Sequence, residues 1–359
     1  MNTNSNRKRA LFLYYELAGY FIASAQRLAS QYPVDVHIVR YPINSVAPFK
    51  FENYEGITFY ERKDFDRNKL MALAKELNPE FIFCCGWMDK DYVAVCKIFK
   101  GITTTIISLD NPWKGNMKQH VGALAGRFYI PKIFNYAWVP GEIQKKYCLK
   151  LGFKKQHIFT GLYVADISMF NKQYEYDRSA KQLNFPHKIL FVGRYTAHKG
   201  VQEMWNAFVR LHKDVPNDWE LWCIGKGELE HLLPVHEKVK NFGFVQPSEL
   251  GQFISQTGVF ILASRLEHWG VVVQEFAAAG MPVISTTKTY AASMFVKNNS
   301  SGIVCEPSSE EALYQSFIKL VSLDHKTLLQ MAEQSHVLAQ QINADTWAQT
   351  AWKFINSHK

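Results

Sequence analysis

Residues able to bind an anion or a sugar gather in three short segments of the second half of the chain. The first, VGRYTAHKG (residues 192–200), has an apolar run, then Gly193, and then Arg194 and Lys199 on either side of a helix start. Two cations beside the N-terminus of a helix favour binding of a phosphate or pyrophosphate, because backbone N–H groups there also attract anions. Taken alone, the segment is equally well explained by solvated cations in a surface loop.

The longest segment, SRLEHWGVVVQEFAAAGMPVIST (264–286), contains two glutamates separated by seven residues. Glu267 follows an apolar run, and Glu275 lies in the second turn of a helix predicted to start near Gly270. Such carboxylates can accept hydrogen bonds from the hydroxyls of a sugar and of a ribose, while the backbone N–H groups from His268 to Val271 face a phosphate. Either glutamate alone would be explained as a helix cap or a surface charge, but the whole string favours a ligand site.

The third segment, CIGKGELE (223–230), contains Gly225 and Gly227, which let the backbone turn sharply and approach a ligand closely. Most turns of this kind bind nothing, so the segment is weak evidence. In the first half, the loop after the first apolar run, from Glu16 to Gly19, lacks the GxGxxG pattern. A dinucleotide site of the usual dehydrogenase kind is therefore not expected.

Short apolar runs alternate with helical patterns along the whole chain, and these elements must position the three segments. The predicted strands are 10–15, 34–40, 81–85, 104–108 and 137–139 in the first half, and 189–193, 221–225, 259–264 and 282–285 in the second. Helical patterns include 21–32, 68–78, 142–151, 201–213, 271–279 and 310–323. Strands separated by such helices form βαβ units with parallel sheets, whose ligands bind at the carboxyl ends of the strands.

Two series of βαβ units in 359 residues predict two doubly wound domains. We place the first at 1–165, the second at 166–340 and a C-terminal segment at 341–359. The junction falls near 166–186, where polar residues crowd around 171–177 and the strand pattern lapses.

The composition, with 47% hydrophobic and 20% charged residues, is that of a globular protein and excludes a disordered or fibrous one. No uncharged apolar run reaches the ~18 residues of a membrane-spanning helix. Glu16 interrupts the apolar stretch that follows Arg7, Lys8 and Arg9, which indicates a first core strand rather than a signal peptide. The six cysteines form no CxxC pair, so we expect buried, reduced thiols in a cytoplasmic protein and no zinc site.

The net charge of +9 is concentrated in the first half: residues 1–165 carry 23 Lys and Arg against 13 Asp and Glu. This imbalance predicts a polyanionic partner such as anionic lipid or a lipid phosphate, or else a solvated basic surface. Nucleic acid is not expected, since no recognisable nucleic-acid motif accompanies the charge. Residues 116–134 combine an apolar face with Lys118, Arg127 and Lys132, and Pro131 would end or bend them. They are compatible with an interfacial membrane segment and with an ordinary core helix.

The strings VGRYTAHKG, IGKGELE, FGFVQPSELGQFISQTGVFILAS and Glu267-x7-Glu275 together resemble the nucleotide-binding domain of retaining glycosyltransferases of the family 4 type. The resemblance is dense over 187–307 and weaker over 138–170, and the first domain is similar only in layout. It implies the GT-B fold: α/β, with two doubly wound, Rossmann-like domains facing across a cleft. It also implies that a C-terminal helix (347–357) crosses back to the first domain.

The resemblance further implies a role for each matching residue. Arg194 and Lys199 would neutralise the diphosphate of the donor as it leaves. Glu267 would hold the hydroxyls of the donor sugar, and Glu275 would bind the ribose. The other donor-binding residues that it implies are Gly19, Gly193, Phe244, Val245, His268, Trp269, Gly270 and Val271, of which Phe244 and Val245 would meet the base.

The chain departs from this family in the first domain, where members often carry a histidine that faces the donor sugar. The corresponding stretch, IISLDNPWKGN (106–116), has Asp110 and Asn111 instead. Either Asp110 supplies the polar contact, or the catalytic arrangement differs. A catalytically silent partner subunit is therefore an alternative to an active enzyme, and a sugar-nucleotide epimerase of the same fold is another.

No metal is expected, because fixed cations can stabilise the leaving diphosphate. The tripeptide Asp64-Phe65-Asp66 resembles a DxD metal motif, but it lies away from any nucleotide-binding strand and is interpreted as a solvated loop. The expected partners are a nucleotide sugar, UDP-linked rather than GDP-linked, and a glycan or lipid-linked acceptor. We expect a cytoplasmic protein in bacterial surface polysaccharide or glycoconjugate assembly, with peripheral contact to anionic membrane.

Overall fold

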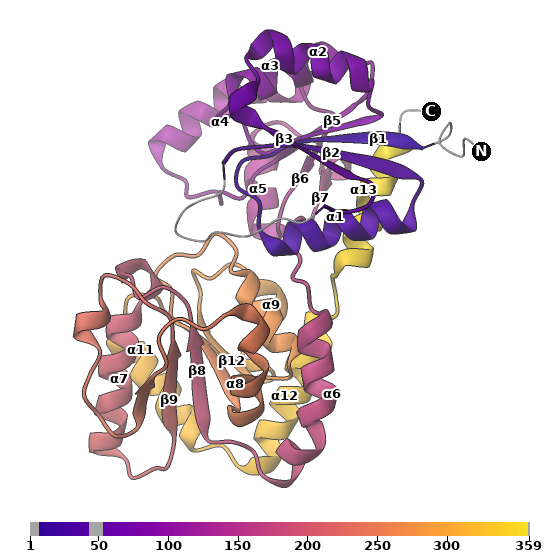
Figure 1. The fold of residues 1–359 in the computed structure, drawn as a ribbon. Coiled ribbons are helices and arrows are strands. Elements are labelled where there is room, and N and C mark those ends of the chain that lie inside the picture. Colours follow the sequence, from indigo (N-terminus) through magenta and orange to yellow (C-terminus); the bar gives the residue numbers. More distant parts are fainter. Residues whose placement is uncertain (1–6, 43–52, 358–359) are drawn as a thin grey trace. The chain divides into compact units, whose positions relative to one another are not determined.

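The structure, a computed structural model, describes residues 7–42 and 53–357, which form two compact units (Figure 1). The first unit contains the chain up to Asp166 and again from Ile342, and the second contains Ile167–Gln341. The chain therefore enters the second unit once and returns, so that its last helix belongs to the first unit, as the GT-B fold implies.

The first unit is built on a parallel sheet of seven strands in the order β3-β2-β1-β4-β5-β6-β7. The strands are β1 (Lys8–Leu13), β2 (Val34–Arg40), β3 (Ile57–Glu61), β4 (Phe81–Cys84), β5 (Thr104–Ser108), β6 (Tyr136–Trp138) and β7 (Ile158–Phe159). Strands β1, β4 and β5 lie in the middle of this sheet, and their apolar side chains are fully buried on both faces.

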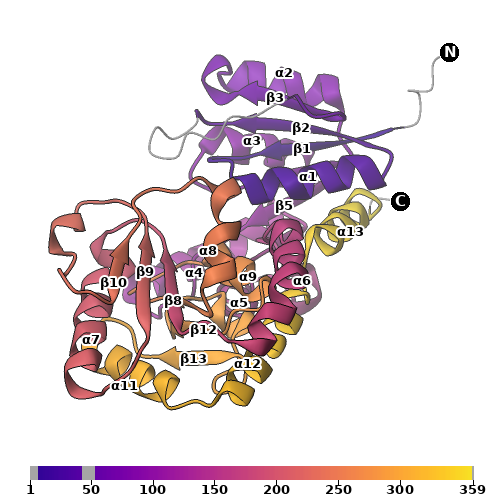
Figure 2. The same ribbon diagram turned by 60° about the horizontal axis from the view of Figure 1, so that its bottom comes forward.

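Helices cover both faces of this sheet, with α1 and α2 on opposite sides (Figure 2). One face is covered by α1 (Gly19–Gln31) and α13 (Ala344–Ile355), which pack against each other. The other is covered by α2 (Arg67–Leu77), α3 (Lys90–Phe99), α4 (Met117–Tyr129) and α5 (Glu142–Lys150). The indole of Trp347 on α13 stacks on Phe12, with ring centroids 5.9 Å apart, and anchors the C-terminal helix in the core.

The second unit has a parallel sheet of six strands in the order β10-β9-β8-β11-β12-β13. The strands are β8 (Lys188–Val192), β9 (Glu220–Ile224), β10 (Val239–Asn241), β11 (Val259–Leu262), β12 (Val283–Thr286) and β13 (Gly302–Cys305). Its helices are α6 (Ser168–Leu183), α7 (Val201–Asp214), α8 (Gly251–Gln256), α9 (Val271–Ala278), α10 (Ala292–Phe295), α11 (Glu310–Val321) and α12 (His325–Ala339). Short 3-10 turns complete the two units: η1 (Arg62–Asp64), η2 (Ile130–Lys132), η3 (Lys155–His157), η4 (Ala197–Lys199), η5 (Glu230–Leu232) and η6 (Pro247–Glu249).

The strands and helices predicted from the sequence pattern are present within two residues of their predicted ends, and the C-terminal helix predicted at 347–357 is Ala344–Ile355. The four strands that the sequence did not indicate, β3, β7, β10 and β13, are the edge strands of the two sheets. Three of them lack the continuous apolar run of a central strand: β7 and β10 have only two and three residues, and β3 buries only Ile57. The fourth, β13, is short but mostly buried. The predicted junction is also occupied: residues 168–183 form α6, whose polar sequence still buries Phe170 and Tyr174.

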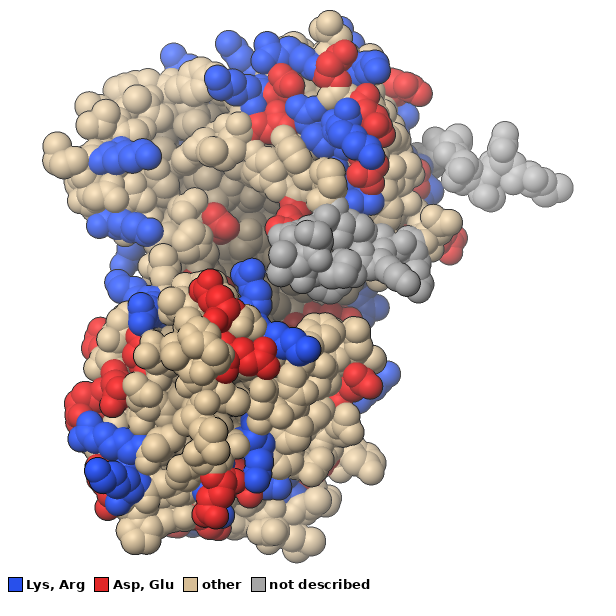
Figure 3. Space-filling model, turned by 60° about the vertical axis from the view of Figure 1, so that its left-hand side comes forward, with Lys and Arg blue, Asp and Glu red and all other residues tan. Residues whose placement is uncertain are grey.

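Helix α4 settles one of the alternatives left open by the sequence. Only Ala123 of this helix is buried, so α4 is not an ordinary core helix. Met117, Val121, Leu124 and Phe128 are each about two-thirds exposed or more and follow one helix face. Figure 3 shows that the face of the first unit with α4 has a wide uncharged area with Lys and Arg at its margins. Within the described ranges, no helix is both long enough and apolar enough to span a bilayer.

Gly200 joins two strand ends in the second unit. It adopts the left-handed conformation (φ 66°) at the start of α7, and a Cβ there would lie 2.1 Å from the carbonyl oxygen of Ala263. Only glycine lets the loop after β8 approach the end of β11 this closely.

Gly200→Ala should lower the free energy of unfolding by about 3 kcal/mol, because the backbone conformation is strained and the Ala263 carbonyl must move. Urea unfolding followed by tryptophan fluorescence measures this loss. Gly122→Ala is the control, since a Cβ at this helical glycine would have no heavy atom of the described residues within 4 Å, and it should gain about 0.5–1 kcal/mol. Equal effects of the two changes would contradict the role assigned to Gly200.

Candidate active site

Three loops of the second unit meet at one edge of its sheet. They follow β8, β9 and β11, which are neighbours in the order β9-β8-β11. Because the strands are parallel, their carboxyl ends lie together, and the three segments singled out in the sequence come from these ends. The structure therefore brings the three segments to one edge of the sheet, where their charged side chains gather.

The glycines of the loop after β9 serve loop packing. The Tyr195 N–H donates to the Lys226 carbonyl at 2.9 Å, so the loops after β8 and β9 run against each other. A Cβ at Gly225 would lie 1.9 Å from the Gly193 oxygen, and one at Gly227 would lie 2.4 Å from the Tyr195 oxygen. These contacts explain both glycines without a ligand, and they hold Gly193 half-buried at the end of β8.

An ion pair between Lys199 and Glu267 connects the loops after β8 and β11. The Lys199 ammonium donates to the Glu267 carboxylate, and the Ser264 hydroxyl lies 3.4 Å from the same carboxylate oxygen. The two charged side chains are 16% and 23% exposed, so a ligand can reach both. The backbone of Glu267 is fixed as well, since its N–H donates to the Lys288 carbonyl at 2.9 Å. The pair thus holds a cation and a carboxylate in fixed positions.

The N-terminus of α9 lies directly beside this ion pair. Gly270 precedes the helix in the left-handed region (φ 92°), and a Cβ there would lie 3.0 Å from the Glu267 side chain. Within the described residues, no side chain caps the helix and its first turn has no acidic residue. The first turn of α9 therefore has no carboxylate that would neutralise the positive end of the helix dipole.

The other predicted donor-binding residues around α9 differ in exposure. His268 and Val271 are half-buried, and Glu275, on the second turn of α9, is half-buried with a polar partner of its own. Trp269 is only 3% exposed, so a ligand would meet its backbone and not its ring. Its indole N–H is buried without a hydrogen-bond partner among the described residues. Arg194, in the loop after β8, is exposed.

Phe244 and Val245 lie in the loop after β10. The Phe244 side chain is 64% exposed, and Val245 is half-buried. Asn241 fixes the start of this loop, because its side-chain oxygen accepts from the Tyr195 hydroxyl at 2.9 Å and from the Gly243 N–H at 3.0 Å. An exposed ring on an anchored loop is suited to stacking on a planar ligand.

His198 was missed by the sequence reasoning, although it lies between two predicted site residues in VGRYTAHKG. Its Nδ1 is 3.1 Å from the Thr196 hydroxyl. Partial burial and the nearby Lys199 and Arg194 cations lower the pKa of His198, so the ring is neutral at pH 7. The histidine becomes notable only in the fold, which brings its loop close to Glu267.

In the first unit, a cavity of about 330 Å³ opens at the carboxyl ends of β1, β4 and β5. Its lining residues are Tyr14, Tyr15, Glu16, Tyr20, Cys85, Gly86, Trp87, Met88, Ser108, Leu109, Asp110, Asn111 and Tyr163. Among the described residues, the lining combines aromatic rings with two carboxylates and contains no Lys or Arg. Aromatic faces and carboxylates suit a neutral, hydroxyl-rich ligand better than an anion.

Asp110 is the predicted site residue that this cavity contains. Burial raises the pKa of Tyr163 and of Tyr14, and the charge of the nearby Asp110 adds to both shifts, so both phenols stay protonated. Gly19 is exposed at the first position of α1 and is not among the lining residues.

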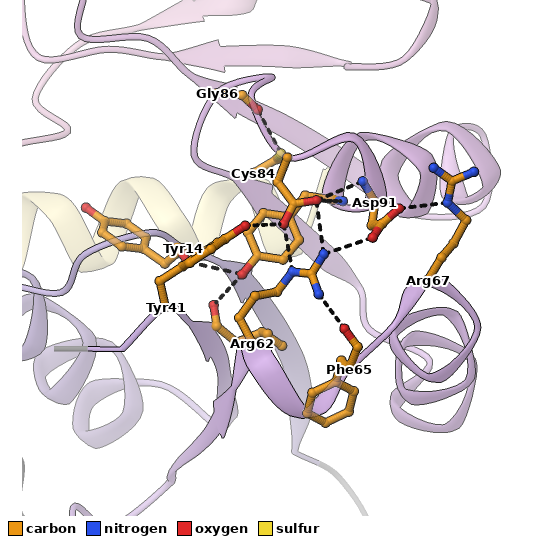
Figure 4. A network of polar contacts seen from close by, with 11 residues as sticks. Tyr14, Tyr41, Arg62, Phe65, Arg67, Cys84, Gly86 and Asp91 are labelled. Atoms are coloured by element: carbon orange, nitrogen blue, oxygen red, sulfur yellow. Dashed lines mark hydrogen bonds and ion pairs between the residues drawn. The ribbon is translucent and has the colours of Figure 1, made fainter.

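A network of ion pairs holds the wall of this cavity (Figure 4). The Arg62 guanidinium donates to Asp89 at 2.7 Å and to Asp91 at 2.9 Å. Asp89 also accepts from the Tyr41 hydroxyl at 2.9 Å and caps α3 through the Asp91 N–H at 2.8 Å. Burial alone would raise the pKa of Asp89, but the hydrogen bonds from Arg62, the backbone and Tyr41 lower it. The network fixes the segment between β4 and α3, which includes Trp87 and Met88 of the cavity lining.

The DxD-like tripeptide has a structural explanation. Asp66 is the N-cap of α2 and accepts from the Lys69 N–H at 2.8 Å, while Asp64 is exposed at the end of η1. The solvated loop expected there is thus a short 3-10 turn followed by a helix cap. No group of three His, Cys, Asp or Glu side chains suited to a metal ion occurs in the part of the chain that the structure describes. Five of the six cysteines are buried, and Cys85 is half-buried.

A family of known proteins matches most of the second unit. Residues 175–336 match the family described as "Glycosyl transferases group 1". The matched range contains the predicted donor-binding residues from Gly193 to Glu275 and excludes Gly19 and Asp110.

Two curated relatives match a stretch of similar length. An uncharacterized glycosyltransferase of Haemophilus influenzae is 24% identical over 42% of this chain and 44% of its own length. The lipopolysaccharide core biosynthesis glycosyltransferase LpsE of Rhizobium meliloti is 26% identical over 41% of this chain and 43% of its own length. The chain therefore matches less than half of the length of each relative.

Solved structures are similar over nearly the whole chain. Anabaena Alr3699/HepE in complex with UDP has a TM-score of 0.71 at 13% identity, covering 96% of this chain and 99% of that one. A glycosyltransferase from Rickettsia africae also has a TM-score of 0.71 at 13% identity, covering 98% and 99%. WaaG, a glycosyltransferase involved in lipopolysaccharide biosynthesis, has a TM-score of 0.63 at 14% identity, covering 97% and 100%. With the two parallel sheets, these likenesses confirm the GT-B fold.

The Arg62 network yields a test of stability. Arg62→Ala should lower the free energy of unfolding by about 3 kcal/mol at pH 7, because it leaves the buried Asp89 carboxylate without its cation. Arg67→Ala, which breaks the exposed pair with Asp91, should cost less than about 1 kcal/mol. Urea unfolding compares the two variants.

The loss of stability in Arg62→Ala should depend on pH, in a direction that identifies Asp89 as its cause. With Arg62 present, the pKa of Asp89 in the folded protein lies below its value of about 4 in the unfolded chain. The ionised carboxylate therefore stabilises the fold above about pH 4, and this stabilisation is lost as the pH falls through the folded pKa. Arg62→Ala removes the largest of the interactions that lower this pKa, so the variant has less of this stabilisation to lose when Asp89 is protonated. The deficit of Arg62→Ala should therefore shrink as the pH falls below about 4. A deficit that is constant with pH would show that Asp89 is not its cause.

Proposed function

We propose that this chain is a retaining glycosyltransferase that transfers a sugar from a nucleoside-diphosphate sugar, without a metal ion. The observation that carries the proposal is the Lys199–Glu267 ion pair beside the N-terminus of α9. Together, these groups provide a cation and a helix end for the diphosphate of one ligand, and a carboxylate for its sugar hydroxyls. The match of residues 175–336 to group 1 glycosyl transferases supports the assignment.

In the proposed reaction, the bond between the sugar and the diphosphate breaks and negative charge develops on the departing phosphate. An acceptor hydroxyl oxygen forms the new glycosidic bond on the same face of the sugar, and its proton goes to the departing phosphate. Lys199 and Arg194 stabilise this charge, and the backbone N–H groups at the start of α9 add to it. Glu267 accepts hydrogen bonds from the sugar hydroxyls, and Glu275 accepts from the ribose. Donor binding then replaces the Lys199–Glu267 pair, because each partner finds a new one on the ligand.

We propose a UDP-linked donor in preference to a GDP-linked one. Among the solved structures that share the fold, Alr3699/HepE was crystallised with UDP and with UDP-glucose. We assign Phe244, whose ring is exposed in the loop after β10, to stacking on the base. Fixed cations replace the divalent metal that would otherwise neutralise the diphosphate.

The proposed acceptor is a glycan or a lipid-linked glycan bound by the first unit, in bacterial surface polysaccharide or glycoconjugate assembly. The tyrosine-rich cavity with Asp110 provides aromatic faces and hydroxyl partners for a sugar. Relatives include LpsE and WaaG, which are named for lipopolysaccharide biosynthesis. The exposed apolar face of α4, with basic residues in the same unit, suits peripheral contact with an anionic membrane from the cytoplasmic side.

Nucleotide binding is the first test. In a thermal-shift panel of UDP, GDP and their sugar conjugates, UDP at ~100 times its Kd should add about 2.7 kcal/mol of stability, with or without a chelator. Glu275→Gln should weaken UDP binding, while Glu237→Gln, an exposed glutamate before β10, should leave it unchanged. No stabilisation by any nucleotide would favour the catalytically silent subunit instead.

Turnover tests the two cations. Arg194→Ala and Lys199→Ala should each lower the rate of nucleoside diphosphate release from the sugar donor by ~10²-fold, because transition-state charge loses a partner. Arg265→Ala is a matched control, since this nearby cation pairs with Glu203 at 2.6 Å. Its rate should stay close to that of the unchanged protein. Normal rates in both site variants would refute the proposed mechanism.

A further inference from the structure

A groove on the surface of the first unit forms a second cavity, distinct from the tyrosine-rich one. It has a volume of about 630 Å³ and lies between α3, α4 and α5. Apolar side chains form its walls, among them Val93 on α3 and Tyr147 and Leu151 near α5. Volumes of this size are typical of ligand sites.

The floor of the groove is bare because α4 contributes glycines there. Gly122 and Gly126 line it one helical turn apart. Glycine inside a helix costs about 0.5–1 kcal/mol relative to alanine. At Gly122 this cost has no packing reason among the described residues, since a Cβ would have none of their heavy atoms within 4 Å. The glycine therefore keeps open a space that any side chain would narrow.

The charge around the groove is of one sign. Lys90 and Lys97, both on α3 and exposed, are its charged lining residues, and the lining contains no carboxylate from the described part of the chain. An apolar groove with cations at its rim is complementary to a molecule with a hydrocarbon chain and a negative group. The same charges repel a second copy of this surface, so a symmetric dimer across the groove is disfavoured.

The groove adjoins the tyrosine-rich cavity. Trp87 lines both of them, so the apolar space and the space that contains Asp110 share this side chain. The Asp89 network described above fixes the segment that carries Trp87. A molecule with a chain, a phosphate and a sugar, in that order, could occupy both spaces at once.

We propose that the groove binds the hydrocarbon chain of a lipid phosphate, with Lys90 and Lys97 at the phosphate. Because the groove adjoins the tyrosine-rich cavity, the saccharide carried by that phosphate would then occupy this cavity. The second statement rests on the proposed function, because it takes this lipid to be the glycosyl acceptor. The binding of the chain and the phosphate does not depend on it.

The test uses the full chain and dodecyl phosphate below its critical micelle concentration, titrated by calorimetry. Gly122→Leu fills the groove floor and should weaken binding by at least tenfold. Ala125→Leu is the matched control, because it adds the same side chain to an exposed position of α4 outside the groove lining. It should change the affinity by less than twofold. Decyl phosphate should bind more weakly than dodecyl phosphate, by up to about 15-fold for two methylenes.

The phosphate and the location are tested separately. Lys97→Gln should weaken the binding of dodecyl phosphate several-fold and leave the affinity for the neutral dodecyl maltoside unchanged. A brominated chain should quench tryptophan fluorescence in the unchanged protein, and less in Trp87→Phe. Circular dichroism and the Tm of Gly122→Leu establish that it is folded. If it is not, Lys97→Gln and Trp87→Phe still decide the question.

Three outcomes would overturn the proposal. Equal binding by Gly122→Leu and Ala125→Leu would place the chain elsewhere. Flotation with vesicles containing phosphatidylglycerol, without binding of monomeric dodecyl phosphate, would mean that α4 only adsorbs to a bilayer. A dimer that Gly122→Leu dissociates in sedimentation would make the groove a self-interface. UDP binding is measured in parallel, so that a protein that binds UDP but not dodecyl phosphate refutes the groove alone.

Discussion

The arrangement of the second unit depends on the contact between Lys199 and Glu267. A lysine and a glutamate 68 residues apart meet because Gly200 lets the loop after β8 lie against the end of β11. The same approach sets Glu267 beside Gly270 and the start of α9. Without this contact, the cation, the carboxylate and the helix end would be three separate surface features. With it, they form one partly buried polar site.

In the first unit, helices cover the two faces of the sheet to different extents. Its sheet is covered completely on the side of α1 and α13, where Trp347 and Phe354 are almost wholly buried. On the other side, α4 is held by few buried side chains and leaves its apolar residues in solvent. A helix that exposes so much apolar surface loses hydrophobic free energy unless another molecule covers it. The groove and the exposed face of α4 both leave apolar surface of the first unit in contact with solvent.

Sequence reasoning located what depends on local pattern. The central strands have continuous apolar runs, and Glu267, Glu275, Arg194 and Lys199 stand at recognisable offsets from them. Most of the edge strands lack such runs, and all four were missed. His198 and the Asp89–Arg62 network were also missed, because their meaning comes from partners distant in the chain: Arg62 and Asp89 are 27 residues apart. Gly225 and Gly227 are the opposite case, in which a sequence pattern suggested a ligand site. The packing of the loops after β8 and β9 explains both glycines without one.

The path of the chain has a consequence for how the protein is made. Lys8 in the first strand contacts Asn356, which follows α13 and lies 348 residues later, at 2.5 Å. During synthesis, most of the first unit emerges before the second unit but lacks α13, while the second unit emerges as one continuous segment. Until α13 is translated, the aromatic face around Phe12 and Trp138 lacks the helix that covers it. The unit that starts folding first is thus the last to finish, and a nascent chain would be most prone to aggregation just before α13 leaves the ribosome.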